Sequence, residues 1–169
     1  RLAESSMRAR RVMELPHVVC ASPAYIARCG APERIEDLRG HNCLVATFDP
    51  CTTWHFHDGR QPVRVDLEGN WRSNNGSALI TAALEGMGIC RLPELYVRPL
   101  LRSGALLPLL QDYAAEPMPV WMVYPGTRHV PAKVRLFIDY FIAGIEALAG
   151  EVAGPPPPAA ESRQRGSPR

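Results

Sequence analysis

The stretch WRSNNGSALITAALEGMGICRLP, residues 71–93, constrains the fold more than any other part of the chain. Its succession of residue types predicts a strand end, a helix, a glycine stop, a short strand and the start of a second helix. Leu79, Ala82 and Ala83 share one face at the three- and four-residue spacing of an amphipathic helix. This stretch therefore predicts one α/β unit.

The ends of the predicted helix carry distinct chemistry. Ser73, Asn74 and Asn75 have side-chain oxygens that can accept from the unpaired N–H groups of a first helical turn. Such a terminus also favours anions, so it can be interpreted either as ordinary capping or as a site for a carboxylate or phosphate on a small ligand. Gly86 suits a left-handed helix stop, and Gly88 permits a tight return into the next strand.

Composition limits the class of protein. With 169 residues, 46% hydrophobic and 21% charged, the chain has room for one domain, or for one compact domain plus fragments of another. No apolar run approaches membrane-spanning length, and no secretion leader opens the sequence. A net charge of +2 does not predict nucleic-acid binding by this piece. Because the chain begins at Arg1 and not at a methionine, we expect it to be a fragment. Because it has neither a long apolar run nor a leader, we expect a soluble cytoplasmic protein without a membrane partner.

The five cysteines are odd in number and show no C-x-x-C pairing. This pattern predicts reduced thiols rather than a disulfide framework.

The sequence before the α/β unit predicts short helices and strands. Residues 1–14 are polar and basic, which predicts an exposed connection or poor order. Further on we expect a buried strand at 17–21, a helix begun by Ser22 and Pro23 and ended by Gly30, a strand at 43–48, and a hairpin over 54–67 turning at Asp58-Gly59.

The segments after the unit end in a long helix. We expect Pro93 to open a helix kinked or broken at Pro99, then an extended segment at 106–110, a loop at 114–119, a buried strand at 120–124, and a helix over 132–148. The last helix carries an apolar stripe that needs a partner surface, made of Val134, Phe137, Ile138, Phe141, Ile142 and Ile145.

Two chemical alternatives stay open. His55 and His57 would share one face of a strand beside Cys51, as metal ligands can, although no fourth ligand is evident. Cys20 or Cys90 could act with His41 or His129 as a hydrolase pair, but nothing local positions a base near a thiolate. We therefore predict no enzyme, no catalytic residue, no metal and no cofactor.

Three motifs occur in a family-like order and spacing: CASPAYIARCGAPERIEDLRGHNCL at 20–44, WHFHDGRQPVRVDLEGNWRSNNGSALITAALEGMGICRLPELYVRPLLRSGALLPLL at 54–110, and VWMVYPGTRHVPAKVRLFIDYF at 120–141. Together they resemble the effector-binding domain of LysR-type bacterial transcriptional regulators, over about residues 17–148. The resemblance implies an α/β fold of the type 2 periplasmic-binding-protein-like kind, with one complete α/β subdomain plus the returning C-terminal helix of the other.

The resemblance also implies a domain organisation. Residues 1–16 would connect from a mostly absent first subdomain, 17–124 would form the second effector-binding subdomain, 125–149 would be a helix returning to the first, and 150–169 would be a disordered Pro-rich tail. A small, anionic effector would bind in the cleft between the subdomains. The effector-binding residues implied by the resemblance are Ser22, Pro23, Thr47, Phe48, Ser73, Asn74, Asn75 and Tyr124.

The implied whole protein is a homo-oligomeric regulator that senses a small-molecule effector. It would contact DNA only through an N-terminal helix-turn-helix that this sequence lacks. The alternative is a periplasmic solute-binding protein of the same fold.

Overall fold

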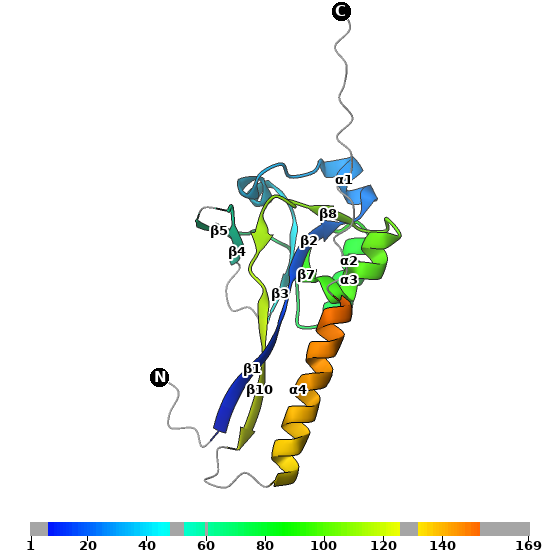
Figure 1. Cartoon of the computed structure of the whole chain (residues 1–169). Coiled ribbons are helices and arrows are strands. Elements are labelled where there is room, and N and C mark those ends of the chain that lie inside the picture. The colour runs from blue at the N-terminus through cyan, green and yellow to red at the C-terminus, as the bar shows by residue number, and fades with distance from the viewer. Residues whose placement is uncertain (1–6, 48–52, 60, 126–131, 153–169) are drawn as a thin grey trace, which may run out of the picture.

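The computed structural model describes residues 7–47, 53–59, 61–125 and 132–152. It has an α/β body from which a long two-stranded ribbon and a helix extend to one side (Figure 1). In the described residues the strands form a five-stranded, a three-stranded and a two-stranded sheet. The mixed α/β fold predicted from the sequence is confirmed.

The five-stranded sheet is the centre of the body. In spatial order its strands are β6 (Trp71–Ser73), β3 (Cys43–Ala46), β7 (Ile89–Pro93), β2 (His17–Ala21) and β8 (Leu107–Leu109). β3 runs parallel to both β6 and β7, whereas β2 runs antiparallel to β7 and to β8. The chain therefore enters β2 at the edge of the sheet where β3, β6 and β7 end.

Both faces of this sheet are buried, as the short apolar runs of its strands predict. Side chains alternate between two clusters along each strand, so that Val19 and Val45 lie in one cluster while Cys20 and Leu44 lie in the other. The first cluster is closed by α1 (Pro23–Cys29), by the 3-10 helix η1 (Ile35–Gly40) and by the three-stranded sheet; the second is closed by α2 (Gly76–Leu84) and α3 (Glu94–Arg102).

The helices follow local signals closely. The Ser22 hydroxyl accepts from Tyr25 N–H at 3.4 Å and Gly30 ends α1 at φ 81°, while Leu79, Ala82 and Ala83 of α2 are all buried as predicted. Pro99 differs from expectation, because α3 runs through it without a break.

The three-stranded sheet contains the predicted hairpin. Its strands are β5 (Pro62–Asp66), β4 (Thr53–His57) and β9 (Ala114–Ala115), so part of the predicted loop at 114–119 is a strand. Gly59 has a φ of 82°, and the Asp58 carboxylate accepts from Gln61 N–H at 2.8 Å, which closes the turn between β4 and β5.

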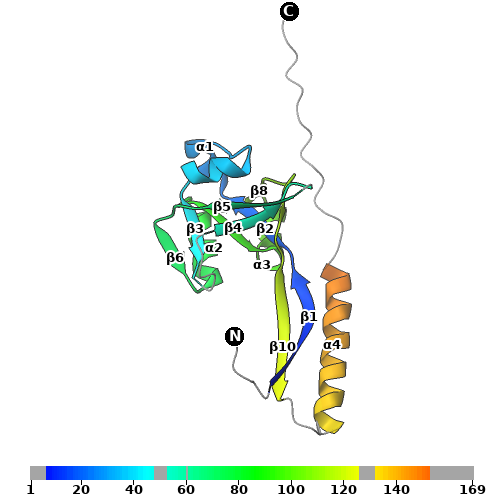
Figure 2. The same cartoon turned by 90° about the vertical axis from the view of Figure 1, so that its left-hand side faces the viewer.

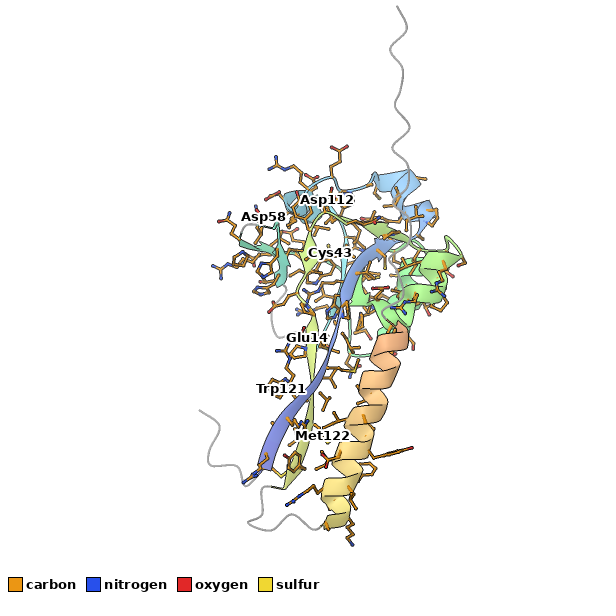
Figure 3. All side chains as sticks on the ribbon, viewed as in Figure 1. Glu14, Cys43, Asp58, Asp112, Trp121 and Met122 are labelled. Atoms are coloured by element: carbon orange, nitrogen blue, oxygen red, sulfur yellow. The ribbon has the colours of Figure 1, made fainter. Side chains whose placement is uncertain are left out.

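The ribbon pairs β1 (Met7–Leu15) with β10 (Met118–Pro125) in antiparallel register, from Leu15 opposite Met118 to Arg8 opposite Tyr124. Residues 1–14 were predicted to be an exposed connection or poorly ordered, and the part that the structure describes is exposed but forms a strand. The segment is exposed but ordered, because β10 supplies the backbone partners that its polar sequence does not reveal. β10 was also expected to be buried, yet the side chain of Trp121, labelled in Figure 3, is 53% exposed.

Helix α4 (Ala132–Val152) lies beside the ribbon in both views (Figures 1 and 2). Ile138 and Ile142 are buried, and the Asp139 carboxylate is 3.9 Å from the Arg10 guanidinium. Phe137 and Phe141 stack with ring centroids 5.9 Å apart but remain largely exposed, so only part of the predicted apolar stripe is covered by the described residues. Among those residues, no helix has the length and apolar content needed to cross a membrane.

Asn42 holds three segments together where β3 and β7 begin. Its side-chain amide donates to Met87 O at 2.7 Å and accepts from Asn70 N–H at 3.0 Å, while its carbonyl accepts from Ile89 N–H at 2.9 Å. Gly88 packs directly on this backbone, and a β-carbon placed there would collide with the Asn42 carbonyl oxygen.

We therefore expect Gly88→Ala to lower the free energy of unfolding by about 1–3 kcal/mol, because the added methyl group meets backbone rather than a movable side chain. Gly40→Ala is the matched control, since a β-carbon there meets nothing within 4 Å. Urea unfolding followed by far-ultraviolet circular dichroism measures both variants. Equal stability of the two would contradict the close contact at Gly88.

Candidate functional site

The candidate site lies at the edge of the five-stranded sheet from which the ribbon leaves. β3, β6 and β7 end there, and β2 begins there because it runs in the opposite direction. Open α/β sheets bind ligands outside the carboxyl ends of their strands and beside helix N-termini. The strand directions thus mark this edge as the place for a ligand.

Four of the predicted residues meet at this edge. Thr47 follows β3, and its N–H donates to Ser73 O at 3.0 Å at the end of β6. The Ser73 hydroxyl accepts from Asn75 N–H at 3.0 Å, and Asn74 and Asn75 are exposed between β6 and α2. Residues far apart in the sequence therefore form one polar rim.

The capping of α2 has a direct consequence for this rim. Asn75 Oδ1 accepts from Ser77 N–H at 2.9 Å and from Ala78 N–H at 3.4 Å. These are donors that an anion at the helix terminus would otherwise use. The Asn75 side chain caps α2 and is also exposed to solvent, where a ligand can reach it. Capping and ligand binding at this terminus therefore involve the same residue.

Ser22 and Pro23 do not belong to this rim. They follow the end of β2, and the antiparallel pairing of β2 with β7 puts that end at the opposite edge of the sheet, beside the start of β7. The Ser22 side chain is 3% exposed and caps α1. The direction of β2, which depends on a partner far away in the sequence, therefore separates these two predicted residues from the rim.

Tyr124 also lies apart from the described rim. Tyr124 is on β10, six positions beyond Met118 (124 − 118), which at about 3.4 Å per residue is roughly 20 Å along the ribbon. Phe48 lies outside the described residues.

A cavity of about 380 Å³ opens at the same edge, on the sheet face covered by β4. We call it the root cavity because part of its wall is the start of β10, at the root of the ribbon. Its lining comes from three sheets: His17, Val45, Ala46 and Arg91 of the five-stranded sheet, Trp54 and His55 of β4, and residues 116–119 at or just before the start of β10.

Polar contacts fix the walls of the root cavity. His17 Nδ1 lies 3.0 Å from the carbonyl oxygen of Glu116, and because a carbonyl only accepts, this nitrogen carries the proton. The Glu116 carboxylate is 4.0 Å from His55 Nδ1 at the exposed rim. The Arg91 guanidinium lies 5.6 Å from the Trp54 ring centroid, a cation–π contact, and donates to His55 O at 3.5 Å.

Arg91 was not predicted as a site residue, although its position in the sequence contains a signal. Arg91 interrupts the buried strand Ile89–Pro93, in which the other four residues are buried. A cation in the middle of such a strand is costly unless it reaches charge, water or an aromatic face, so it marks a place where the sheet meets a cavity.

The buried thiols among the described residues are not activated as nucleophiles. Cys20 and Cys90 are fully buried, with sulfur atoms 3.6 Å apart. The hydrogen bond with Cys20, together with burial, raises the pKa of Cys90 well above its ordinary value, and burial raises the pKa of Cys43 to about 12. Both shifts disfavour the reactive thiolate. Of the proposed bases, His41 hydrogen-bonds to Tyr25 and His129 lies outside the described residues.

His55 and His57 share the exposed face of β4, as the alternation of a strand requires. Cys51, the third member of the proposed metal site, lies outside the described residues. Within the described ranges, no three His, Cys, Asp or Glu side chains are grouped so that they could hold a metal ion.

The fold and the polar edge are those of a ligand-binding domain of the type 2 periplasmic-binding-protein-like class. Comparison with known proteins gives the family, because residues 1–145 match the family model described as LysR substrate binding domain. The chain belongs to this family.

Similar proteins are transcriptional regulators. The chain is 32% identical over 155 residues to the uncharacterized HTH-type transcriptional regulator YhjC of Escherichia coli K12, covering 85% of this chain and 49% of the relative. It is 28% identical over 141 residues to the probable HTH-type transcriptional regulator LtrA of Klebsiella pneumoniae, covering 81% and 46%. The chain thus spans about half the length of these relatives.

Solved structures agree with this assignment. The full-length Vibrio cholerae virulence activator AphB matches with a TM-score of 0.70 and 30% identity, covering 84% of this chain and 49% of AphB. The regulatory domain of CrgA from Neisseria meningitidis matches with a TM-score of 0.68 and 30% identity, covering 83% and 70%. These similarities do not favour the periplasmic solute-binding alternative.

Thiol accessibility provides one test of the site chemistry. In the native protein at pH 8 we expect iodoacetamide to modify the exposed Cys29, while Cys20, Cys43 and Cys90 react only after unfolding. Peptide mass spectrometry reads each position separately. Rapid modification of native Cys20 or Cys90 would restore the nucleophile hypothesis.

Helix capping provides another test. Asn75→Ala removes the acceptor for Ser77 and Ala78 and should lower the free energy of unfolding by about 1 kcal/mol. Asn75→Asp retains an acceptor oxygen and should be close to the wild type in urea unfolding. If Asn75→Ala is as stable as Asn75→Asp, the cap contributes nothing.

Proposed function

We propose that this chain is the effector-sensing part of a bacterial LysR-type DNA-binding transcriptional regulator and that it binds a small anionic molecule. The observation that carries the proposal is the meeting of Thr47, Ser73, Asn74 and Asn75 at the edge where the ribbon leaves the sheet. Hydroxyl and amide groups beside a helix N-terminus suit a carboxylate or phosphate.

The proposed mechanism is a shift between conformations. A ligand that contacts both the sheet edge and the elements beyond the ribbon stabilises one relative orientation of the two, by no more than its difference in affinity between them. In an oligomer such a shift changes the spacing of the DNA-binding parts. The division into a connection, a second subdomain at 17–124 and a returning helix remains part of this proposal.

The partners follow from the same proposal. DNA would be contacted by a helix-turn-helix outside this chain, since relatives are named HTH-type regulators and the net charge here is only +2. The whole protein would be a cytoplasmic homo-oligomer. We propose no enzymatic activity, and buried thiols with raised pKa values support that view.

The rim can be tested in the complete gene product with a transcriptional reporter. Asn75→Asp keeps the cap but adds a negative charge, and Thr47→Val removes a hydroxyl at the end of β3. Each should raise the effector concentration needed for a half-maximal response by about tenfold, the effect of losing one charge-assisted hydrogen bond.

Asn70→Asp is the matched control, because it makes the same chemical change just before β6, at the opposite edge. Its response should equal that of the wild type, and promoter occupancy without effector should be unchanged in all variants. Normal responses from both rim variants would refute the proposed site.

A further inference from the structure

The pairing of β1 with β10 shifts register at one point of the ribbon. Arg11 of β1 lies opposite Trp121 of β10. The next pair toward the body is Met13 with Val120, so Val12 is an extra residue that β10 does not match. Two residues opposite one form a β-bulge, which interrupts the hydrogen-bonded ladder and bends the strand. The pairing that holds the ribbon straight is therefore weakest at Val12.

The bulge divides the ribbon into two ladders. The inner ladder pairs residues 13–15 with 118–120 and joins the body, whereas the outer ladder pairs residues 7–11 with 121–125. Figure 3 shows Glu14 of the inner ladder nearer the body than Trp121 of the outer ladder. A change in the direction of the ribbon can occur either at the bulge or at the junction between the inner ladder and the body.

Hydrogen bonds fix the junction with the body. The N–H of Glu94, the first residue of α3, donates to Pro16 O at 2.8 Å and so ties the end of β1 to a helix. On the other strand, Glu116 donates its N–H to His55 O at 3.1 Å, and its carbonyl accepts from His17 Nδ1 at 3.0 Å. Both strands of the ribbon therefore enter the body through residues that are already bonded to it.

Prolines stiffen the same junction. Pro16 separates β1 from β2, Pro117 precedes β10, and Pro119 is the second residue of β10. Each proline ring holds φ near about −65°, so the backbone at these positions has little freedom to rotate. Leu15, beside Pro16, is buried and adds side-chain packing to the constraint. Rotation at the junction would have to break hydrogen bonds and disturb packed side chains, which makes it the more costly of the two movements.

The bulge is spanned by a contact that opens at small cost. The Arg11 guanidinium pairs with the Glu14 carboxylate, so one ion pair connects the outer ladder to the inner ladder. Both side chains are 48% exposed, and an ion pair in contact with water contributes little stability. The outer ladder is also linked to α4, because the Arg10 guanidinium lies 3.9 Å from the Asp139 carboxylate. Bending at the bulge thus exchanges a solvated ion pair for water and moves the outer ladder together with α4.

We propose that the β-bulge at Val12 is the point at which the ribbon bends, and that the junction of the ribbon with the body is rigid. The inference deepens the proposed function, on which its biological meaning rests, because it places the conformational shift of the regulator within the ribbon. An effector that fixes the bend at Val12 sets the orientation of the outer ladder and α4 relative to the five-stranded sheet. The Arg11–Glu14 pair limits how far the bulge opens.

The bend can be measured in the 169-residue chain by double electron–electron resonance. One spin label is attached to the exposed Cys29 on α1, and the other to Val123→Cys on the outer ladder, where the native side chain is 56% exposed. Cys51→Ser keeps the labelling to these two sites, since the remaining cysteines are buried. We expect deletion of Val12 to narrow the distribution of distances to about half its width, because it makes the ladder regular without changing any other pair.

Substitutions on either side of the bulge provide the controls. Val12→Ala retains the extra residue and should keep the wild-type width. Arg11→Gln should broaden the distribution, because the ion pair across the bulge is lost, whereas Arg8→Gln, within the outer ladder, should leave it unchanged. His17→Ala removes one hydrogen bond of the junction and should also leave the width unchanged, since the other contacts of the junction remain.

If deletion of Val12 unfolds the chain, hydrogen exchange in the wild type decides instead. The ladder-bonded amides of residues 8–11 should exchange about tenfold faster than those of residues 13–15, with a step at the bulge. Fraying of the ribbon from its tip would give a gradual rise from residue 15 to residue 8 and would overturn the inference.

An unchanged width after deletion of Val12 would also overturn it, as would a broader distribution in His17→Ala, because either result places the bend at the junction. None of these measurements requires an effector. The reporter test of the rim therefore remains a separate test of the proposed function, and either proposal can fail while the other stands.

Discussion

The antiparallel pairing of β2 with β7 is the constraint on which the rest of the structure depends. It reverses β2 relative to β3 and β6, so the chain enters the sheet at the edge where the parallel strands end. The ribbon, the N-terminus of α2 and the root cavity consequently share that edge. If β2 were parallel to β7, the ribbon would be attached at the opposite edge, away from the rim at Thr47 and Asn75 and from the root cavity.

Local signals were sufficient to predict the elements near the site. The α2 unit was predicted correctly because its cap, its apolar face and Gly86 act within a few residues, and Gly86 does adopt a φ of 71°. The hairpin and α1 were predicted for the same reason. By contrast, β1 exists because of a partner more than a hundred residues away, which its arginine-rich sequence does not indicate.

The predicted residues that the structure brings together are those that belong to such local units. Thr47 and Asn75 each close a local element, and the parallel pairing of β3 with β6 brings them together. Ser22 was assigned to the candidate site through the family resemblance, but its position depends on the direction of β2, which no neighbouring residue specifies. Arg91 was not predicted as a cavity residue, because the cavity also needs Trp54 and the start of β10, and only the folded chain brings these segments to Arg91.

The edge offers two electrostatic environments with different physical limits. At α2 the positive end of the helix dipole is already engaged by Asn75 Oδ1, so an anion there must share or displace a cap worth about 1 kcal/mol. In the root cavity, the Arg91 guanidinium lies 5.6 Å from the Trp54 ring centroid and donates to His55 O at 3.5 Å. The rim at Thr47 and Asn75 is therefore better suited to recognising the polar groups of a ligand that reaches across the edge than to holding a full negative charge by itself.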